Sequence, residues 1–242
     1  MDEIRGFAVF CMVFYHGFYT LAFLFQSEIG LFWLRFFTPA EPWFAGAFIL
    51  IAGISSDLSH SNLVRGLKLL GVALVVTFAT WIVVPDELIL FGILHFLSVC
   101  MIVFGLLQPK LKRMKFSRIP VAVCALLFAV TYALPKGYLG FPPHAAIRLP
   151  AALYSTNWLA PLGFNSPNFT SADYFPLLPW IFIFAAGTVI GKLAAQGKFP
   201  KWMYISRVPL LSWLGKHALV IYVLHQPVIF GVGEAISYLI GK

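Results

Sequence analysis

Long apolar stretches separated by short polar segments dominate the sequence. Seven of them reach the roughly 20 residues that a helix needs to cross a membrane core of about 30 Å. They are residues 4–24, 43–59, 63–84, 88–108, 118–135, 174–195 and 214–239. Helices are expected because lipid offers no partners to backbone polar groups, and the short-period alternation of a membrane barrel is not visible. The pattern predicts an all-α, polytopic bundle of about seven transmembrane helices.

The segments between the spans indicate how the chain is organised. QPKLKRMKFSRIP, from Gln108 to Pro120, is short and basic and divides four helices from three. The segment from Pro135 to Asp173 is long and poor in charge, so we expect it to fold back over the outer mouth with one short helix. GLFWLRFF is too short to span and should lie at the outer interface. Without repeats or low-complexity tracts, residues 1–242 are predicted to form a single domain.

Composition and charge support this interpretation. The chain is 60% hydrophobic and 11% charged, against roughly 45–50% and about 25% in soluble domains. Its net charge is +8, and placing the N-terminus in the cytoplasm puts thirteen of the seventeen Lys and Arg residues on that side, as the positive-inside rule requires. These residues are expected to meet membrane lipids or a phosphorylated substrate rather than nucleic acid. The three cysteines lack metal-ligand spacing, so no metal site is predicted.

Two ionisable side chains share one face of the first span, RGFAVFCMVFYHGFY. Ionisable residues within a membrane are costly, which makes them candidates for function. Eleven residues at about 100° each return a helix to nearly the same face, so Arg5 and His16 lie on one stripe, about 16 Å apart. Arg5 could also be a positive-inside anchor, and His16 a histidine hydrogen-bonded between helices.

His225 is the second histidine expected near mid-membrane. Pro227 removes a backbone donor from the last span and should kink the helix there. The imidazole of His225 and the amide of Gln226 would then lie beside loosened backbone. This concentration of hydrogen-bonding groups indicates a site rather than packing.

His95 and Asp173 are polar residues with a structural alternative. His95, in FGILHFLSVC, shares a face with Gly92 and Ser98, so close packing and a Ser–His hydrogen bond explain it nearly as well as chemistry does. Asp173 precedes the sixth span, where it could cap the helix or orient an imidazole.

Five blocks of the sequence follow one another in an order typical of a known family. They are DEIRGFAVFCMVFYHGFY, FILIAGISSDLS, VRGLKLLGVALVVTFAT with FGILHFLS, DYFPLLPWIFIFAAGTVIGK, and WLGKHALVIYVLHQPVI. The ordered set resembles the bacterial proteins related to the catalytic domain of heparan-alpha-glucosaminide N-acetyltransferase. The first block also resembles the membrane O-antigen acyltransferases, which carry an arginine, ten residues and then a histidine.

The resemblance implies transmembrane acylation in the inner (plasma) membrane of a bacterium. Acetyl-CoA is the implied donor on the cytoplasmic side, and a sugar or amino sugar on the outer side is the implied acceptor. Arg5 and His16 match the acyltransferase pattern, and His225 matches the histidine of the closing block. Heparan-alpha-glucosaminide N-acetyltransferase itself, the lysosomal enzyme of this family, has an asparagine in place of His16. Its proposed catalytic histidine lies in the loop that follows the first span. That loop contains no histidine here, which excludes an acetyl-histidine at that place and makes His16 the leading base.

A hypothesis for the mechanism follows from these matches. The phosphates of CoA would bind basic residues at the cytoplasmic mouth by Coulomb attraction; these are Arg5, Arg65, Lys68 and Lys216. His16 would act as general base on the acceptor, because its ordinary pKa lies near the working pH. Further catalytic candidates are His225, His95 and Asp173. Candidate substrate contacts are Gln226, Trp180 and Tyr174.

Other functions stay open on the sequence. A transporter or flippase for small solutes or lipid-linked sugars, without thioester chemistry, equally suits mid-membrane histidines and a proline-broken helix. A structural or sensory bundle would use the same residues only for stability. Seven short, aromatic-rich spans could also pair into a homodimer.

Overall fold

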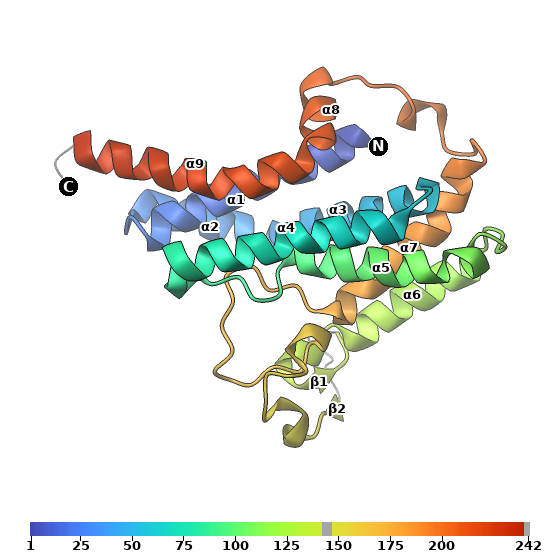
Figure 1. The fold of residues 1–242 in the computed structure, drawn as a ribbon, viewed down its shortest axis with the longest axis horizontal. Coiled ribbons are helices and arrows are strands. Elements are labelled where there is room, and N and C mark those ends of the chain that lie inside the picture. The colour runs from blue at the N-terminus through green and yellow to red at the C-terminus, as the bar shows by residue number, and fades with distance from the viewer. Residues whose placement is uncertain (142–146, 240–242) are drawn as a thin grey trace. The chain divides into compact units, whose positions relative to one another are not determined.

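The computed structural model describes residues 1–141 and 147–239, and helices dominate it (Figure 1). The α-helices are α1 (Asp2–Phe23), α2 (Glu28–Phe37), α3 (Glu41–Leu58), α4 (Asn62–Val83), α5 (Ile93–Leu111), α6 (Arg118–Thr131), α7 (Leu177–Ala195), α8 (Pro209–Lys216) and α9 (Ala218–Leu239). Within the described residues, seven helical segments are long and apolar enough to cross a membrane. The prediction of an all-α, polytopic protein is confirmed.

Some predicted boundaries are wrong. The fourth span continues through Pro109 to Leu111, which shortens the expected basic loop. The last span is divided at His217 into α8 and α9, and α9 is one helix across Pro227. GLFWLRFF lies within α2, and a single 3-10 turn connects α2 to α3.

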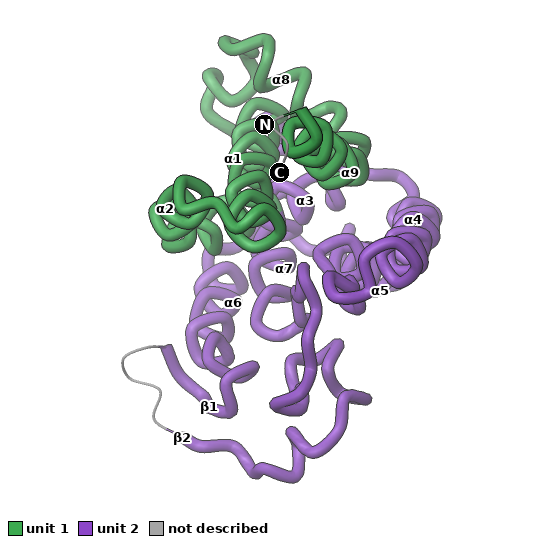
Figure 2. Tube along the Cα trace, turned by 90° about the vertical axis from the view of Figure 1, so that its left-hand side faces the viewer, with its two compact units in different colours: residues 1–48, 199–242 green, residues 49–198 purple. Residues whose placement is uncertain are grey.

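The chain forms two compact units (Figure 2). Unit 1 contains residues 1–48 and 199–242, and unit 2 contains residues 49–198. Helix α3 begins in unit 1 and ends in unit 2. The N-terminal and C-terminal helices therefore belong to the same unit.

Two glycines bring α1 and α8 into backbone contact within unit 1. A Cβ atom added to Gly6 would lie 1.8 Å from the carbonyl oxygen of Leu211, and one added to Gly215 would lie 2.0 Å from that of Asp2. No side chain fits at either position. The contact is reinforced by Glu3, whose carboxylate accepts hydrogen bonds from the backbone N–H groups of Arg207 and Val208 before α8.

Small residues also set the packing of unit 2. A Cβ atom on Gly53 of α3 would lie 2.2 Å from the carbonyl oxygen of Phe184, and one on Gly187 of α7 would lie 2.3 Å from that of Leu50. Membrane helices pack through such positions because lipid leaves close van der Waals contact as a main attraction between helices. The α3–α7 crossing is consequently close and apolar at its centre.

The long connection between α6 and α7 contains short elements. Strands β1 (Tyr138–Leu139) and β2 (Ile147–Arg148) pair antiparallel, and four-residue and three-residue 3-10 turns follow at Ala151–Tyr154 and Ala160–Leu162. The described part of this connection has these turns instead of the expected short α-helix. The Tyr154 hydroxyl donates a hydrogen bond to the carbonyl oxygen of Leu134, 2.6 Å away, which ties the connection to the end of α6.

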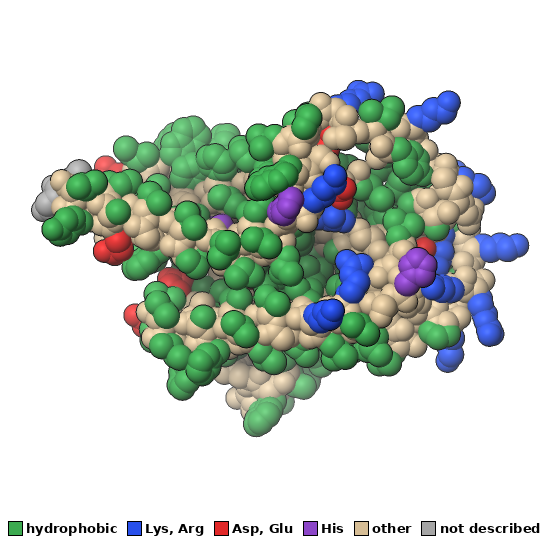
Figure 3. All heavy atoms as spheres, turned by 45° about the horizontal axis from the view of Figure 1, so that its top comes forward, with side chains coloured by type: hydrophobic (Ala, Val, Ile, Leu, Met, Phe, Trp, Pro, Cys, Tyr) green, Lys and Arg blue, Asp and Glu red, His purple; other side chains and the backbone are tan. Residues whose placement is uncertain are grey.

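Hydrophobic side chains cover much of the helix surface (Figure 3). Val75 of α4 and Ile119 and Leu126 of α6 are each more than 60% exposed. Such exposure suits contact with lipid rather than water. These positions agree with a membrane location for the helices.

Candidate active site

Two histidines from opposite ends of the chain meet inside unit 1. His16 of α1 and His225 of α9 have ring centroids 5.1 Å apart. His225 is buried and its Nδ1 lies 2.6 Å from the carbonyl oxygen of Tyr222. Because a carbonyl only accepts, Nδ1 carries the proton, and Nε2 holds the lone pair of the neutral ring. Two imidazoles expected at mid-membrane are therefore neighbours.

Thr20 extends this polar layer by one turn of α1. It is 2% exposed, and its hydroxyl lies 3.1 Å from Oε1 of Gln226, to which it donates. The amide of Gln226 is thereby oriented, with its NH2 group directed away from Thr20. Sequence reasoning missed Thr20, although a hydroxyl four residues after His16 in an apolar helix is a usable signal. We call His16, Thr20, His225 and Gln226 the histidine layer.

Two of the expected phosphate-binding residues lie beside the α1–α8 contact. Arg5 precedes Gly6, and Lys216 follows Gly215, so the glycine contact brings their backbones together in unit 1. The Lys216 side chain is exposed. Arg5 donates to the Asp2 carboxylate at 3.0 Å, a pair that leaves the guanidinium partly exposed.

The other two expected phosphate-binding residues belong to unit 2. Arg65 and Lys68 are both exposed near the beginning of α4. They lie three residues apart, which places them on neighbouring turns of one helix face. The four cations thus occur as one pair in each unit.

His95 occupies a separate polar site in unit 2. It is 6% exposed, and its Nε2 lies 3.3 Å from Oγ1 of Thr77. The Thr77 hydroxyl donates to the carbonyl oxygen of Ile89 at 2.7 Å, so Nε2 of His95 carries the proton and donates to Thr77. Nδ1 then holds a lone pair with no hydrogen-bond partner among the described residues. The expected Ser–His contact is different: the Ser98 hydroxyl donates to the backbone carbonyl of His95.

Asp173 caps the helix that carries His95. Its Oδ2 accepts a hydrogen bond of 3.0 Å from the backbone N–H of Ile93, at the beginning of α5. Helix α7 begins only at Leu177, with Pro176 at its N-cap position. The prediction that Asp173 caps the sixth span is therefore wrong. Gly92 is required here, because a Cβ atom would lie 2.7 Å from Oδ2 of Asp173.

The aromatic residues that were expected to contact substrate are engaged in packing. The Tyr174 hydroxyl donates to the carbonyl oxygen of Ala160 at 2.6 Å. Burial, and then the neighbouring Tyr154, raise the pKa of the Tyr174 phenol far above its usual value. Trp180 contacts Phe128 and Phe175, with ring centroids 5.5 and 5.4 Å away.

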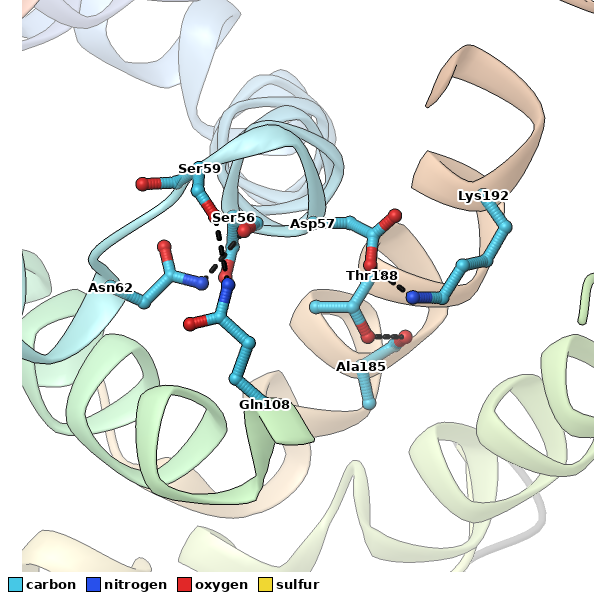
Figure 4. A network of polar contacts seen from close by, with 8 residues as sticks. All are labelled: Ser56, Asp57, Ser59, Asn62, Gln108, Ala185, Thr188 and Lys192. Atoms are coloured by element: carbon cyan, nitrogen blue, oxygen red, sulfur yellow. Dashed lines mark hydrogen bonds and ion pairs between the residues drawn. The ribbon is translucent and has the colours of Figure 1, made fainter. Parts of the chain in front are cut away.

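An ion pair that sequence reasoning missed joins α3 and α7 in unit 2 (Figure 4). The Lys192 ammonium donates to the Asp57 carboxylate, and the two side chains are only 12% and 9% exposed. Asp57 is the last charged residue of α3, and Lys192 is the last charged residue of α7. The two are far apart in the sequence, so their spacing does not predict that they pair. The pair lies beside a small cavity that is also lined by Asn62, Gln108 and Thr188.

These features define a class of protein: a multi-pass helical membrane protein that holds imidazole groups inside its spans. The family model for heparan-alpha-glucosaminide N-acetyltransferase, catalytic, matches residues 1–227. The chain belongs to this family, and it is a transmembrane acetyltransferase in that general sense. The matched residues include every candidate site residue named above. No curated protein and no solved structure matches the chain.

Proposed function

We propose that the protein transfers an acetyl group from cytoplasmic acetyl-CoA to a sugar hydroxyl or amine on the outer side of the inner (plasma) membrane. The observation that carries the proposal is the His16–His225 pair, with ring centroids 5.1 Å apart and Gln226 held by Thr20 beside it. The family match supports acetyl transfer in general. The whole chain, residues 1–242, is taken as one catalytic domain.

The histidine layer would perform the chemical step. His16 takes the proton from the acceptor hydroxyl or amine as that atom attacks the thioester carbonyl, forming a tetrahedral oxyanion. Collapse of the oxyanion breaks the carbon–sulfur bond, and the leaving thiolate takes a proton from the imidazolium of His16. The acceptor is then acetylated and CoA leaves as the thiol.

The hydrogen bonds refine the roles of His225 and Gln226. A neutral His225 has its proton engaged by the Tyr222 carbonyl, so its other nitrogen can orient a proton but cannot donate one. The NH2 group of Gln226 is directed away from Thr20 and is a donor for the oxyanion. We therefore assign oxyanion stabilisation to Gln226 and orientation to His225.

The donor would enter along α1. In unit 1, Arg5 and Lys216, which flank the α1–α8 glycine contact, would bind phosphate; in unit 2, Arg65 and Lys68 are the candidate phosphate contacts. Arg5 and His16 are eleven residues apart on α1, a rise of about 16 Å. That span suits a pantetheine arm held by its phosphates at one end and reacting at the other.

Unit 2 contains further candidate contacts for the acceptor. Nδ1 of His95 is buried and has no hydrogen-bond partner in the described part of the chain, so it would accept from a substrate N–H or O–H group. Asp173 acts as a positioning residue, because it caps α5 ahead of His95. Tyr174 and Trp180 would shape the acceptor pocket from the same segment.

Purified protein tests the proposal directly. In nanodiscs with acetyl-CoA labelled in the acetyl group and a panel of amino sugars and glycans, we expect labelled acceptor and one equivalent of free CoA thiol. Counterflow of labelled sugar in proteoliposomes without thioester consumption would instead identify a transporter and overturn the proposal.

A further inference from the structure

Ring contacts fix how α1 lies against α2 and the beginning of α3 within unit 1 (Figure 2). Phe18 of α1 contacts Trp33 and Phe37 of α2, with ring centroids 5.9 and 5.6 Å away. Tyr15 of α1 contacts Phe44 of α3, with ring centroids 6.1 Å apart. Residue numbers fall along α1 while they rise along α2 and α3, so the two segments run antiparallel.

This register places Glu41 opposite His16. Glu41 is the first residue of α3 and lies between Phe37 and Phe44 in the chain, and His16 lies between the two α1 residues that those rings contact. The Tyr15 phenol interacts electrostatically with the Glu41 carboxylate, and the Tyr15 ring centroid is 5.5 Å from that of His16. Glu41 therefore lies at the depth of the histidine layer.

The helical path from α2 to α3 is interrupted at the same depth. A 3-10 turn over Thr38–Ala40 separates the two helices, and Pro39 and Pro42 flank Glu41. Proline has no backbone N–H group, so neither residue can donate to the carbonyl four positions earlier. Such interruptions occur inside membranes where protein or a cavity surrounds the backbone, and they mark substrate sites in transporters. The interruption gives the Glu41 carboxylate a polar setting.

Helix lengths separate Glu41 from the other acidic residues of unit 1, which are Asp2, Glu3, Glu28 and Glu234. Asp2 and Glu3 precede His16 on α1 by at least thirteen residues, a rise of about 20 Å. Glu28 begins α2, and Glu234 follows His225 by nine residues of α9, about 14 Å. Among these acids, Glu41 is the one whose helix register matches that of His16.

A carboxylate at this place meets a need of the proposed reaction. When His16 takes the proton of the acceptor, it becomes an imidazolium inside the spans, where a charge is costly. His225 supplies no compensating charge, because its ring is neutral and its proton is directed at the Tyr222 carbonyl. An opposite charge nearby favours the charged form of an imidazole, and the attraction is stronger away from water.

We propose that Glu41 is a positioning residue of the active site, whose carboxylate stabilises the imidazolium that His16 becomes during acetyl transfer. The inference rests on the proposed function, since it takes His16 as the base. Glu41 keeps its negative charge throughout. The proton passes from the acceptor to His16 and then from His16 to the leaving thiolate, so Glu41 takes no part in the bond changes.

Glu41→Gln tests this role, because it removes the charge and nearly keeps the shape. We expect kcat to fall about tenfold to 100-fold with an unchanged KM for acetyl-CoA, since the charge acts only once His16 is protonated. Glu41→Asp keeps a carboxylate and should recover most of kcat. Glu28→Gln, at an exposed position at the beginning of α2, is the matched control and should behave as the wild type.

A spectroscopic measurement tests the inference without turnover. In nanodiscs that hold protein with nitrogen-15-labelled histidine, the His16 signal is assigned by its loss in His16→Gln. We expect the imidazolium signal of His16 to appear at a pH about one unit lower in Glu41→Gln than in the wild type, because the charged ring has lost its counter-charge. The titratable groups in ring contact with His16, Tyr15 and His225, are the same in both proteins.

Each other outcome is decisive. An unchanged His16 titration in folded Glu41→Gln protein would overturn the inference and leave Glu41 as a charge at the beginning of α3. Equal kcat values for this variant and the wild type would also overturn it. If the wild-type protein transfers no acetyl group, the proposed function fails, and the titration still decides whether Glu41 stabilises the charged ring. Glu41→Ser, which removes the charge but can cap α3, gives the same comparison if Glu41→Gln does not fold.

Discussion

The imidazole rings of His16 and His225 lie with their centroids 5.1 Å apart, at a tilt of 55°. One ring comes from the first helix and the other from the last. Paired imidazoles offer a base and a group that orients the transferred proton at the same place. The proposed chemistry depends on this pair.

Replacing His16 with Ala should lower acetyl transfer by roughly 100-fold to 10,000-fold, the usual contribution of a general base. Initial rates of labelled acetyl transfer measure the effect, and thermal melting confirms that the variant is folded. His60→Ala is the matched control, because His60 is exposed between α3 and α4 and should leave the rate unchanged. A folded His16→Ala protein with nearly wild-type turnover would refute the role of His16 as base.

Replacing Gly6 with Ala should separate α1 from α8, because the added Cβ atom would lie 1.8 Å from the carbonyl oxygen of Leu211. We expect a loss of about 1–3 kcal/mol in stability and a higher KM for acetyl-CoA, since Arg5 and Lys216 flank the contact. Melting temperature and donor titration measure both effects.

Gly231→Ala is the control for this change, since nothing lies within 4 Å of a Cβ atom at Gly231 of α9. Alanine has the better helix propensity by about 1 kcal/mol, so this variant should melt at an equal or higher temperature. If the two variants behave alike, the close α1–α8 contact is wrong.

Hydropathy predicted the seven spans because the length of an apolar run is a local property. The histidines that meet in unit 1 were also found, since a polar side chain in an apolar run is visible without any knowledge of contacts. What the sequence could not give was the pairing of helices. Asp173 caps α5 rather than the helix that follows it, and this depends on the path of a long connection.

The Asp57–Lys192 pair illustrates the same limit. Each residue lies at the end of a span, where charges are common, and only the close α3–α7 crossing at Gly53 and Gly187 brings them together. The division of the last span into α8 and α9 was likewise missed, although Gly215, Lys216 and His217 interrupt the apolar residues at this point.

Replacing Asp57 with Asn should leave the Lys192 ammonium uncompensated in a nearly buried position. Breaking a buried ion pair costs roughly 3–5 kcal/mol, so we expect a large fall in melting temperature. The double variant Asp57→Asn with Lys192→Gln removes both charges and should recover much of the loss. Lys198→Gln, at an exposed position after α7, is the control. Equal melting of the single variant and the wild type would contradict a structural ion pair.

The phenol of Tyr174 should make stability fall at alkaline pH. Its pKa is raised by burial and by Tyr154, whereas in the unfolded chain it is about 10. Below pH 10 both states hold the proton and stability is unaffected. Above pH 10 the unfolded state loses its proton first, so stability falls as pH rises. Melting temperatures between pH 8 and pH 11 measure this decline.

Tyr174→Phe removes both the ionisable group and the hydrogen bond to Ala160. The variant should therefore melt lower at pH 8, by about 1 kcal/mol of stability, yet decline less steeply than the wild type above pH 10. Tyr138→Phe, at a 40% exposed position on β1, should retain the wild-type slope. Parallel curves for Tyr174→Phe and the wild type would mean that the Tyr174 phenol ionises as readily in the folded protein as in the unfolded chain.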